Sequence, residues 1–118
     1  MKKLSVDSIE APSRLKRAIQ EFVKESVERY RKRIDTMILY GSVVRGEAND
    51  DSDIDILVVW KGTTLDAMDS LGEIALKVLL KHGCGISIHP MSPKHYDYVS
   101  GINTHFFRNV AREGIVVA

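Results

Sequence analysis

Two aspartates alternate with isoleucines at the start of an apolar run, and this pattern constrains the chain more than any other. The run reads Asp53-Ile54-Asp55-Ile56-Leu57-Val58-Val59-Trp60. Its second half is rich in β-branched residues, which predicts a strand over 53–60. Because side chains alternate along a strand, both carboxylates point to one face, with Cα atoms about 6.6 Å apart. The isoleucines between them point to the core.

Two carboxylates side by side repel each other, and a purely structural sheet gains nothing from that repulsion. A hard divalent cation removes it, and Mg²⁺ favours one or two protein carboxylates, with waters and substrate phosphates as its other ligands. The pair therefore predicts a site for Mg²⁺ or Mn²⁺ at Asp53 and Asp55. The alternative is a solvated strand end whose charges keep the sheet edge soluble.

A second strand, over 36–40, ends at Gly41-Ser42. Glycine permits a close backbone approach, and N–H groups at a helix start form an anion cradle together with a serine hydroxyl. Arg45 follows one turn later and can neutralise phosphate charge, and Gly46 lets the chain turn away. Taken alone, the segment is more typical of a plain strand-to-loop turn with a serine cap than of a phosphate site.

The rest of the chain predicts an α/β (α+β) fold with a small mixed sheet flanked by helices. Helical spacing predicts amphipathic helices over 13–33 and 64–82, a short helix from Ser92-Pro93 and another over 103–112. A third strand is expected over 85–91 and an edge strand over 115–117. A length of 118 residues fits one domain. We expect that domain over 13–118, with 1–12 as a loosely ordered N-terminal segment.

Composition narrows the class of protein. A formal net charge of +1 gives no strong sign of a nucleic-acid partner. No apolar stretch approaches the roughly 20 residues of a membrane span, and the first residues lack the apolar core of a signal peptide. A soluble, cytoplasmic protein with no membrane partner is therefore expected.

Cys84 is the only cysteine and is expected to be buried, whereas Trp60 is expected at a surface or contact.

Together, the two motifs resemble the signature of the nucleotidyltransferase superfamily that includes DNA polymerase beta. The segment reads Gly41-Ser42-Val43-Val44-Arg45-Gly46, then five residues, then Ser52-Asp53-Ile54-Asp55. The short chain is similar to the minimal nucleotidyltransferase domains of archaea and bacteria. This resemblance implies that Gly41 and Ser42 hold a nucleoside triphosphate and that Asp53 and Asp55 hold the metal. It also implies that Ser52 caps or orients the start of the acidic strand.

The third predicted strand departs from the family pattern. The superfamily usually supplies a third carboxylate there, and Ser87 occupies the expected place, with His89 facing the same way two residues later. No Asp or Glu lies between Glu73 and Asp97. The third acid often serves as metal ligand and as base for the incoming hydroxyl. Its absence therefore bears on transfer more than on nucleotide binding.

The resemblance implies transfer of AMP from ATP to an acceptor hydroxyl. A minimal domain carries no acceptor domain, and many such transferases pair with a small helical HEPN-type protein as the antitoxin of a toxin–antitoxin pair. The alternative is a non-catalytic module that binds nucleotide and Mg²⁺ and works as a regulatory or complex-forming subunit. A resemblance to aminoglycoside-modifying transferases is weaker, because their acceptor-binding domain is missing. A homo-oligomer is left open.

Overall fold

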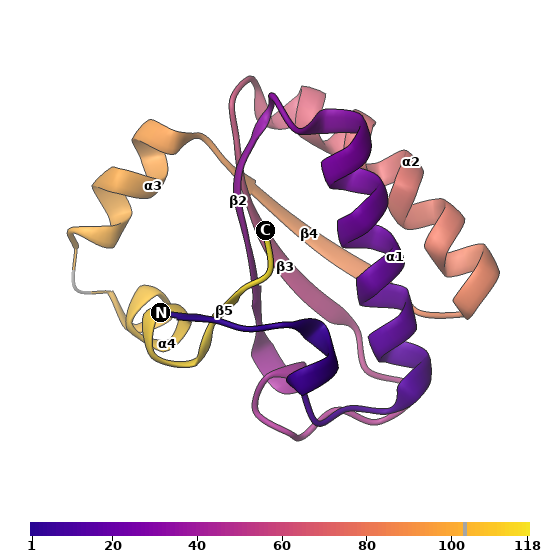
Figure 1. Ribbon diagram of the computed structural model, residues 1–118. Helices are drawn as coiled ribbons and strands as arrows, with labels where there is room; N and C mark the ends of the chain where they lie inside the picture. Colours follow the sequence, from indigo (N-terminus) through magenta and orange to yellow (C-terminus); the bar gives the residue numbers. More distant parts are fainter. Residues whose placement is uncertain (103) are drawn as a thin grey trace.

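In the part of the chain that the computed structural model describes, residues 1–102 and 104–118, five strands form one mixed sheet with helices on both faces (Figure 1). In chain order the elements are β1 Lys2–Lys3, the 3₁₀ turn η1 Val6–Ser8, α1 Ser13–Tyr30, β2 Ile34–Tyr40, the 3₁₀ turn η2 Gly41–Val43, β3 Ile54–Trp60, α2 Thr64–His82, β4 Ile86–Met91, α3 Pro93–Ser100, α4 His105–Glu113 and β5 Ile115–Val116. The sheet order is β1-β5-β2-β3-β4. The predicted fold class is confirmed.

Strand β3 lies inside the sheet, antiparallel to β2 and parallel to β4, and its side chains alternate between two cores. Ile54, Ile56, Val58 and Trp60 belong to the larger core, to which α1 and α2 contribute. Leu57 and Val59 point the other way and pack with Val110 of α4. Figure 1 shows the same division, with α1 and α2 on one face of the sheet and α3 and α4 on the other. Asp55 shares the face of Leu57 and Val59.

Local capping explains where the two long helices begin and end. The Asp66 N–H donates to Thr63 Oγ1 at 3.0 Å at the start of α2, and Gly83 ends it at a φ of 70°, which matches the predicted bounds. Helix α1 ends at Tyr30, before the predicted residue 33. There the Arg33 side chain donates to the Lys61 carbonyl at 2.9 Å, which draws the chain into β2. None of the described helices is long and apolar enough to cross a membrane.

The two ends of the chain meet in the sheet. Strand β5 lies between β1 and β2. A strand was predicted over 115–117 at the edge of the sheet, and that position is wrong, because β5 is an inner strand and β1 is the outermost strand on this side. A two-residue strand such as β1 has no alternation that a sequence reading could detect. Helix α4 begins at His105, capped by Thr104, while residue 103 of the predicted helix lies outside the described residues. The loosely ordered segment over 1–12 and the single domain over 13–118 stay predictions.

The prediction that Trp60 lies at a surface is wrong. Its side chain is 1% exposed, its Nε1–H donates to Asp66 Oδ2 at 3.2 Å, and its ring meets the Tyr30 ring edge-on at 5.6 Å. A partner for the indole N–H makes this burial favourable, and Asp66 lies just beyond the strand. Cys84 is buried, as predicted.

The buried hydroxyl of Ser26 in α1 yields a stability prediction. Ser26 is 0% exposed, and its hydroxyl meets no hydrogen-bond partner among the described residues. A buried unsatisfied hydroxyl costs about 1–3 kcal/mol, and alanine is also the better helix former. We expect Ser26→Ala to raise the free energy of unfolding by about 1 kcal/mol or more in urea denaturation. Glu28→Ala, at an exposed position of α1, is the control for an alanine substitution that removes no buried hydroxyl. A loss of stability in Ser26→Ala would contradict the prediction.

Candidate active site

The start of β3 brings the two aspartates to one end of the α3/α4 face. Asp53 directly precedes the strand and is exposed, and Asp55 is its second residue and is half-buried. In the sheet register, Asp55 lies between Tyr40 of β2 and Ser87 of β4. In Figure 1 this is the lower end of the sheet, where β2 ends and β3 begins. The sequence thus predicted correctly that Asp55 and the core isoleucines point to opposite faces.

Each carboxylate lies against a backbone position that has no side chain. A Cβ placed on Gly41 would lie 2.5 Å from Asp55 Oδ2, and one placed on Gly85 would lie 2.9 Å from Asp53 Oδ1. Gly41 also has a φ of 84°, a conformation that favours glycine. Gly85 was not predicted as a site residue, because its approach to Asp53 depends on how β4 aligns with β3. The only hint in the sequence is a glycine directly before the third strand.

The turn after β2 places the other predicted phosphate-binding residues beside Asp55. The Gly41 carbonyl accepts from the N–H groups of Val44 and Arg45 at 3.2 and 3.3 Å. Arg45 pairs with Glu47 and, at 3.4 Å, with Glu113 of α4. Its side chain is still 44% exposed, so an anionic ligand can compete with these surface ion pairs.

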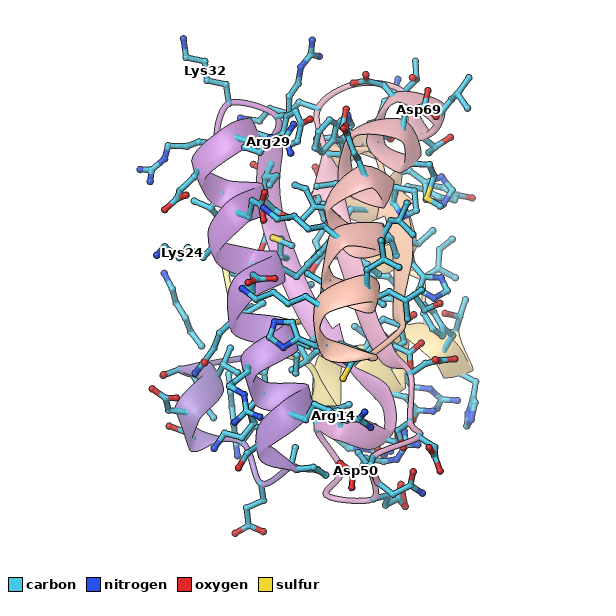
Figure 2. The ribbon with its side chains drawn as sticks, turned by 90° about the vertical axis from the view of Figure 1, so that its right-hand side faces the viewer. Arg14, Lys24, Arg29, Lys32, Asp50 and Asp69 are labelled. Atoms are coloured by element: carbon cyan, nitrogen blue, oxygen red, sulfur yellow. The ribbon has the colours of Figure 1, made fainter. Side chains whose placement is uncertain are left out.

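Ser52 organises the loop that leads into the acidic strand. Its Oγ accepts from the Asn49 N–H at 2.9 Å, and its own N–H donates to the Asn49 carbonyl at 3.1 Å. The same loop is tied to the start of α1, because Arg14 donates to the Asp50 carbonyl. Figure 2 shows Arg14 and Asp50 together at one end of the molecule. Ser52 therefore acts on the turn before Asp53.

Burial and charge both disfavour the ionised form of Asp55. Burial raises the pKa of this carboxyl most, the nearby Asp53 charge raises it further, and His89 and Arg45 oppose the change. The neighbouring Tyr40 is affected in the same way, since burial and the Asp55 charge raise the pKa of its phenol to about 12. Tyr40 therefore stays neutral at physiological pH. Perturbed groups of this kind gather at functional sites.

Ser87 lies where the third carboxylate of the family is expected, directly beside Asp55. Its Oγ is 3.3 Å from His89 Nε2, and that nitrogen is 3.9 Å from Asp55 Oδ1. Among the described residues, no group of three or more His, Cys, Asp or Glu side chains is placed to hold a metal ion. The chain thus offers two carboxylates, a hydroxyl and an imidazole at this edge.

A small hollow next to Gly41 extends the site toward α4. It has a volume of about 150 Å³ and is lined by Tyr40, Gly41, Arg45, Phe106, Asn109, Val110 and Glu113. The Phe106 ring is 48% exposed and meets the Tyr40 ring edge-on at 5.7 Å. The place of Phe106 beside Gly41 depends on the long-range contact between α4 and β2.

Comparison with known proteins identifies the family. A family model described as the nucleotidyltransferase domain matches residues 17–109. The chain belongs to this nucleotidyltransferase family. The protein MJ0604 of Methanocaldococcus jannaschii, named as a candidate protein adenylyltransferase, is 40% identical over 101 residues, which cover 86% of this chain and 95% of that protein. MJ0141 of the same organism bears the same description and is 32% identical over 100 residues, covering 84% and 94%. The chain is therefore a transferase.

Solved structures agree on the fold. The chain is similar to a chain in the crystal structure of a mutant toxin–antitoxin pair, MntA–HpeT, with a TM-score of 0.53 and 16% identity over 84% of this chain and 71% of that chain. It is also similar to a candidate nucleotidyltransferase from Sulfolobus solfataricus, with a TM-score of 0.50 and 24% identity over 75% and 81%. At these identities the likeness concerns the architecture alone.

The close approach at Gly41 gives a prediction with a matched control in Gly46. Both glycines have positive φ, of 84° and 73°, but a Cβ on Gly46 would meet nothing within 4 Å. Alanine at either position should lower stability by about 1–2 kcal/mol because of the backbone conformation. Only Gly41→Ala should displace Asp55, so we expect it to weaken Mn²⁺·ATP binding by about tenfold or more in calorimetry. Equal affinities in the two variants would contradict this role of Gly41.

The raised pKa of Asp55 gives a second prediction, on stability without metal. An acid whose pKa is raised by folding loses stability as the pH rises through that pKa. At pH 7 and without divalent ions, Asp55→Asn should therefore raise the melting temperature by a few degrees. The gain should disappear as the pH falls well below the ordinary carboxyl value of about 3.9, because Asp55 is then protonated in both the folded and the unfolded state. Asp51→Asn, at an exposed position, is the control and should change neither the melting temperature at pH 7 nor its dependence on pH. A destabilised Asp55→Asn protein at pH 7 would refute the prediction.

Proposed function

We propose that this nucleotidyltransferase transfers AMP from ATP to a hydroxyl group of a partner protein. The observation that carries the proposal is the arrangement of Asp53 and Asp55, each against a glycine backbone, beside the turn that begins at Gly41. The two Methanocaldococcus jannaschii relatives support it, since both are named as candidate protein adenylyltransferases.

The donor set at the edge fits a hard divalent cation. Asp53 and Asp55 supply carboxylate oxygens, which suit Mg²⁺ or Mn²⁺, and the remaining positions suit water and substrate phosphate. The lack of a Cβ on Gly41 leaves the Asp55 carboxylate accessible from the side of the phosphate turn. A cation held by these two residues would neutralise charge on the phosphate oxygens.

The other site residues would bind and orient the nucleotide. The turn at Gly41 and the Ser42 hydroxyl hold the triphosphate, and Arg45 neutralises part of its charge. Ser52 keeps the loop before Asp53 in place. In the reaction, the acceptor oxygen bonds to the α-phosphorus, the bond from that phosphorus to the β-bridging oxygen breaks, and pyrophosphate leaves.

The proton of the acceptor hydroxyl needs a base, and this is where the chain departs from its family. Ser87 stands in the place of the third acid, and a serine hydroxyl accepts a proton poorly. His89, which lies within 3.3 Å of Ser87 Oγ, can take part in its place. A carboxylate of the partner can do so as well. We therefore expect slow transfer by the isolated chain.

A small helical HEPN-type protein is the partner we propose, with this chain as the antitoxin of a cytoplasmic toxin–antitoxin pair. One solved structure of the same fold belongs to a toxin–antitoxin pair, which supports this assignment. A second candidate function is a nucleotide- and Mg²⁺-binding module without catalysis. Ser87 in register with Asp55 is the observation that favours it.

The test is a transfer assay with ATP radiolabelled in its α-phosphate. We expect little labelled protein from the isolated chain with Mg²⁺, and strong labelling of the small helical protein encoded beside it when both are present. Ser87→Asp should accelerate transfer by the isolated chain by up to about 10²–10⁴-fold, the range of general-base assistance. Asp55→Asn should abolish labelling, and Asp51→Asn is the matched acidic control that should retain it.

Other results of these experiments would contradict particular parts of the proposal. Rapid labelling by the isolated wild type would show that no partner is needed to complete the site. Labelling unchanged by Ser87→Asp would mean that the third acid belongs elsewhere. Intact Mg²⁺·ATP binding without transfer under any condition would favour the binding module, and equal Mg²⁺·ATP affinity in wild type and Asp55→Asn would remove the basis for the metal site.

A further inference from the structure

One side of α2 carries large apolar side chains that its own chain leaves exposed. They are Leu65, Met68, Leu76, Leu79 and Leu80, with exposed fractions of 71, 45, 55, 43 and 79%. The residues that this helix buries in the core are different ones, namely Ala67, Leu71, Ile74 and Val78. Helix α2 is therefore apolar on two sides, and the core uses only one of them.

Single exposed apolar residues are normal on a protein surface, but these follow a helical pattern. Leu65, Met68, Gly72, Leu76 and Leu79 are spaced by three, four, four and three residues, which places them in one line along the helix. We call these five residues the outer stripe, and Leu80 widens it at one end. A line of apolar side chains of this kind is typical of a helix that packs against a second helix.

The outer stripe reads the same in both directions from Gly72. Met68 and Leu76 lie four residues on either side of it, and Leu65 and Leu79 lie seven residues away. If two copies of α2 cross antiparallel with a two-fold axis at Gly72, Leu65 meets the partner's Leu79 and Met68 meets the partner's Leu76. An isologous interface requires this kind of self-complementary pattern.

No contact among the described residues accounts for a glycine at position 72 of this helix. Glycine inside a helix is unfavourable compared with alanine, and a Cβ on Gly72 would meet nothing within 4 Å. Its φ is not among the positive values of the described glycines. A second helix backbone crossing at this position would benefit from the missing side chain, because the two helices could then approach more closely.

The charges of α2 favour the same antiparallel arrangement. Its first half carries Asp66 and Asp69, Glu73 lies at its midpoint, and its second half carries Lys77 and Lys81. Figure 2 shows α2 alongside α1, with Asp69 near the first turns of α2. The two lysines pair with α1 glutamates, but each side chain is still 62% exposed. An antiparallel partner brings acidic halves toward basic halves, whereas a parallel partner would place like charges together.

We infer that a second copy of this chain binds along the outer stripe, forming a two-fold dimer through antiparallel α2 helices. The inference does not depend on the proposed transfer reaction. Helix α2 covers the face of the sheet opposite to Asp55 and Leu57, so the dimer leaves both active-site edges free.

The first test is the mass of the purified chain by light scattering and sedimentation from about 1 to about 100 µM. We expect a concentration-dependent species of about twice 13.3 kDa. Leu76→Glu should weaken self-association by about 100-fold, because it places a charge next to the partner's Met68. Tyr98→Glu, an equally drastic change at a 69% exposed residue of α3, is the control and should leave the dimer intact.

Two further experiments distinguish a defect of this interface from a folding defect. Gly72→Ala should raise the melting temperature of the dilute monomer, since alanine suits the helix, yet weaken the dimer by about tenfold. A disulfide should form between copies when Met68→Cys protein is mixed with Leu76→Cys protein, and not within either alone, where the two sulfurs lie about 12 Å apart along the helix axis. A chain that stays monomeric, including one that associates only with a different protein, would overturn the inference. So would a dimer that Leu76→Glu leaves unchanged.

Discussion

The alternation of side chains along β3 is the constraint on which the rest of this structure depends. Ile54, Ile56 and Val58 are committed to the core beneath α1 and α2, so the residues between them must face the other side of the sheet. There, Val110 of α4 packs on Leu57 in the second half of the strand. The first half of the strand on this side is left to Asp53 and Asp55. The carboxylates therefore stand at the only part of β3 where the described helices leave room for charge.

The arrangement of Asp55 argues for a binding site over a merely solvated strand end. A solvated end would leave both carboxylates fully in water, whereas Asp55 is half-buried, lies against Gly41 and carries a raised pKa next to a second negative charge. The ionised form of such a group weakens the fold at neutral pH although His89 and Arg45 partly stabilise it, and a bound cation would remove the remaining cost. Natural proteins break local rules in this way mainly at functional sites.

Much of this could be predicted from the sequence, because local patterns determine it. The periodicity of 64–82 and its capping residues gave the bounds of α2. The alternation along the strand gave the opposite facing of Asp55 and the core isoleucines. The errors involve contacts between distant residues. Trp60 is buried because the side chains of Tyr30 and Asp66 meet it, and α1 stops early because Arg33 reaches the Lys61 carbonyl. Likewise, Gly85 joins the site only through the register of β4 on β3.

The strand edge next to Asp55 indicates which kind of acceptor the site could bind. The hollow beside Gly41 is about 150 Å³ and neither aspartate lines it, so it is too small to enclose either a nucleotide or an acceptor. Next to Asp55, the sheet order ends at β4, and Ser87 and His89 lie on this outermost described strand. An acceptor that approaches Asp55 from there meets a strand edge that is free to take another chain. A small molecule gains few contacts at such an edge, whereas a protein can cover it and bring a carboxylate of its own to the place of the third acid. The serine at the place of that acid and the protein acceptor that we propose would then have a common physical cause, because the molecule that binds there would complete the site.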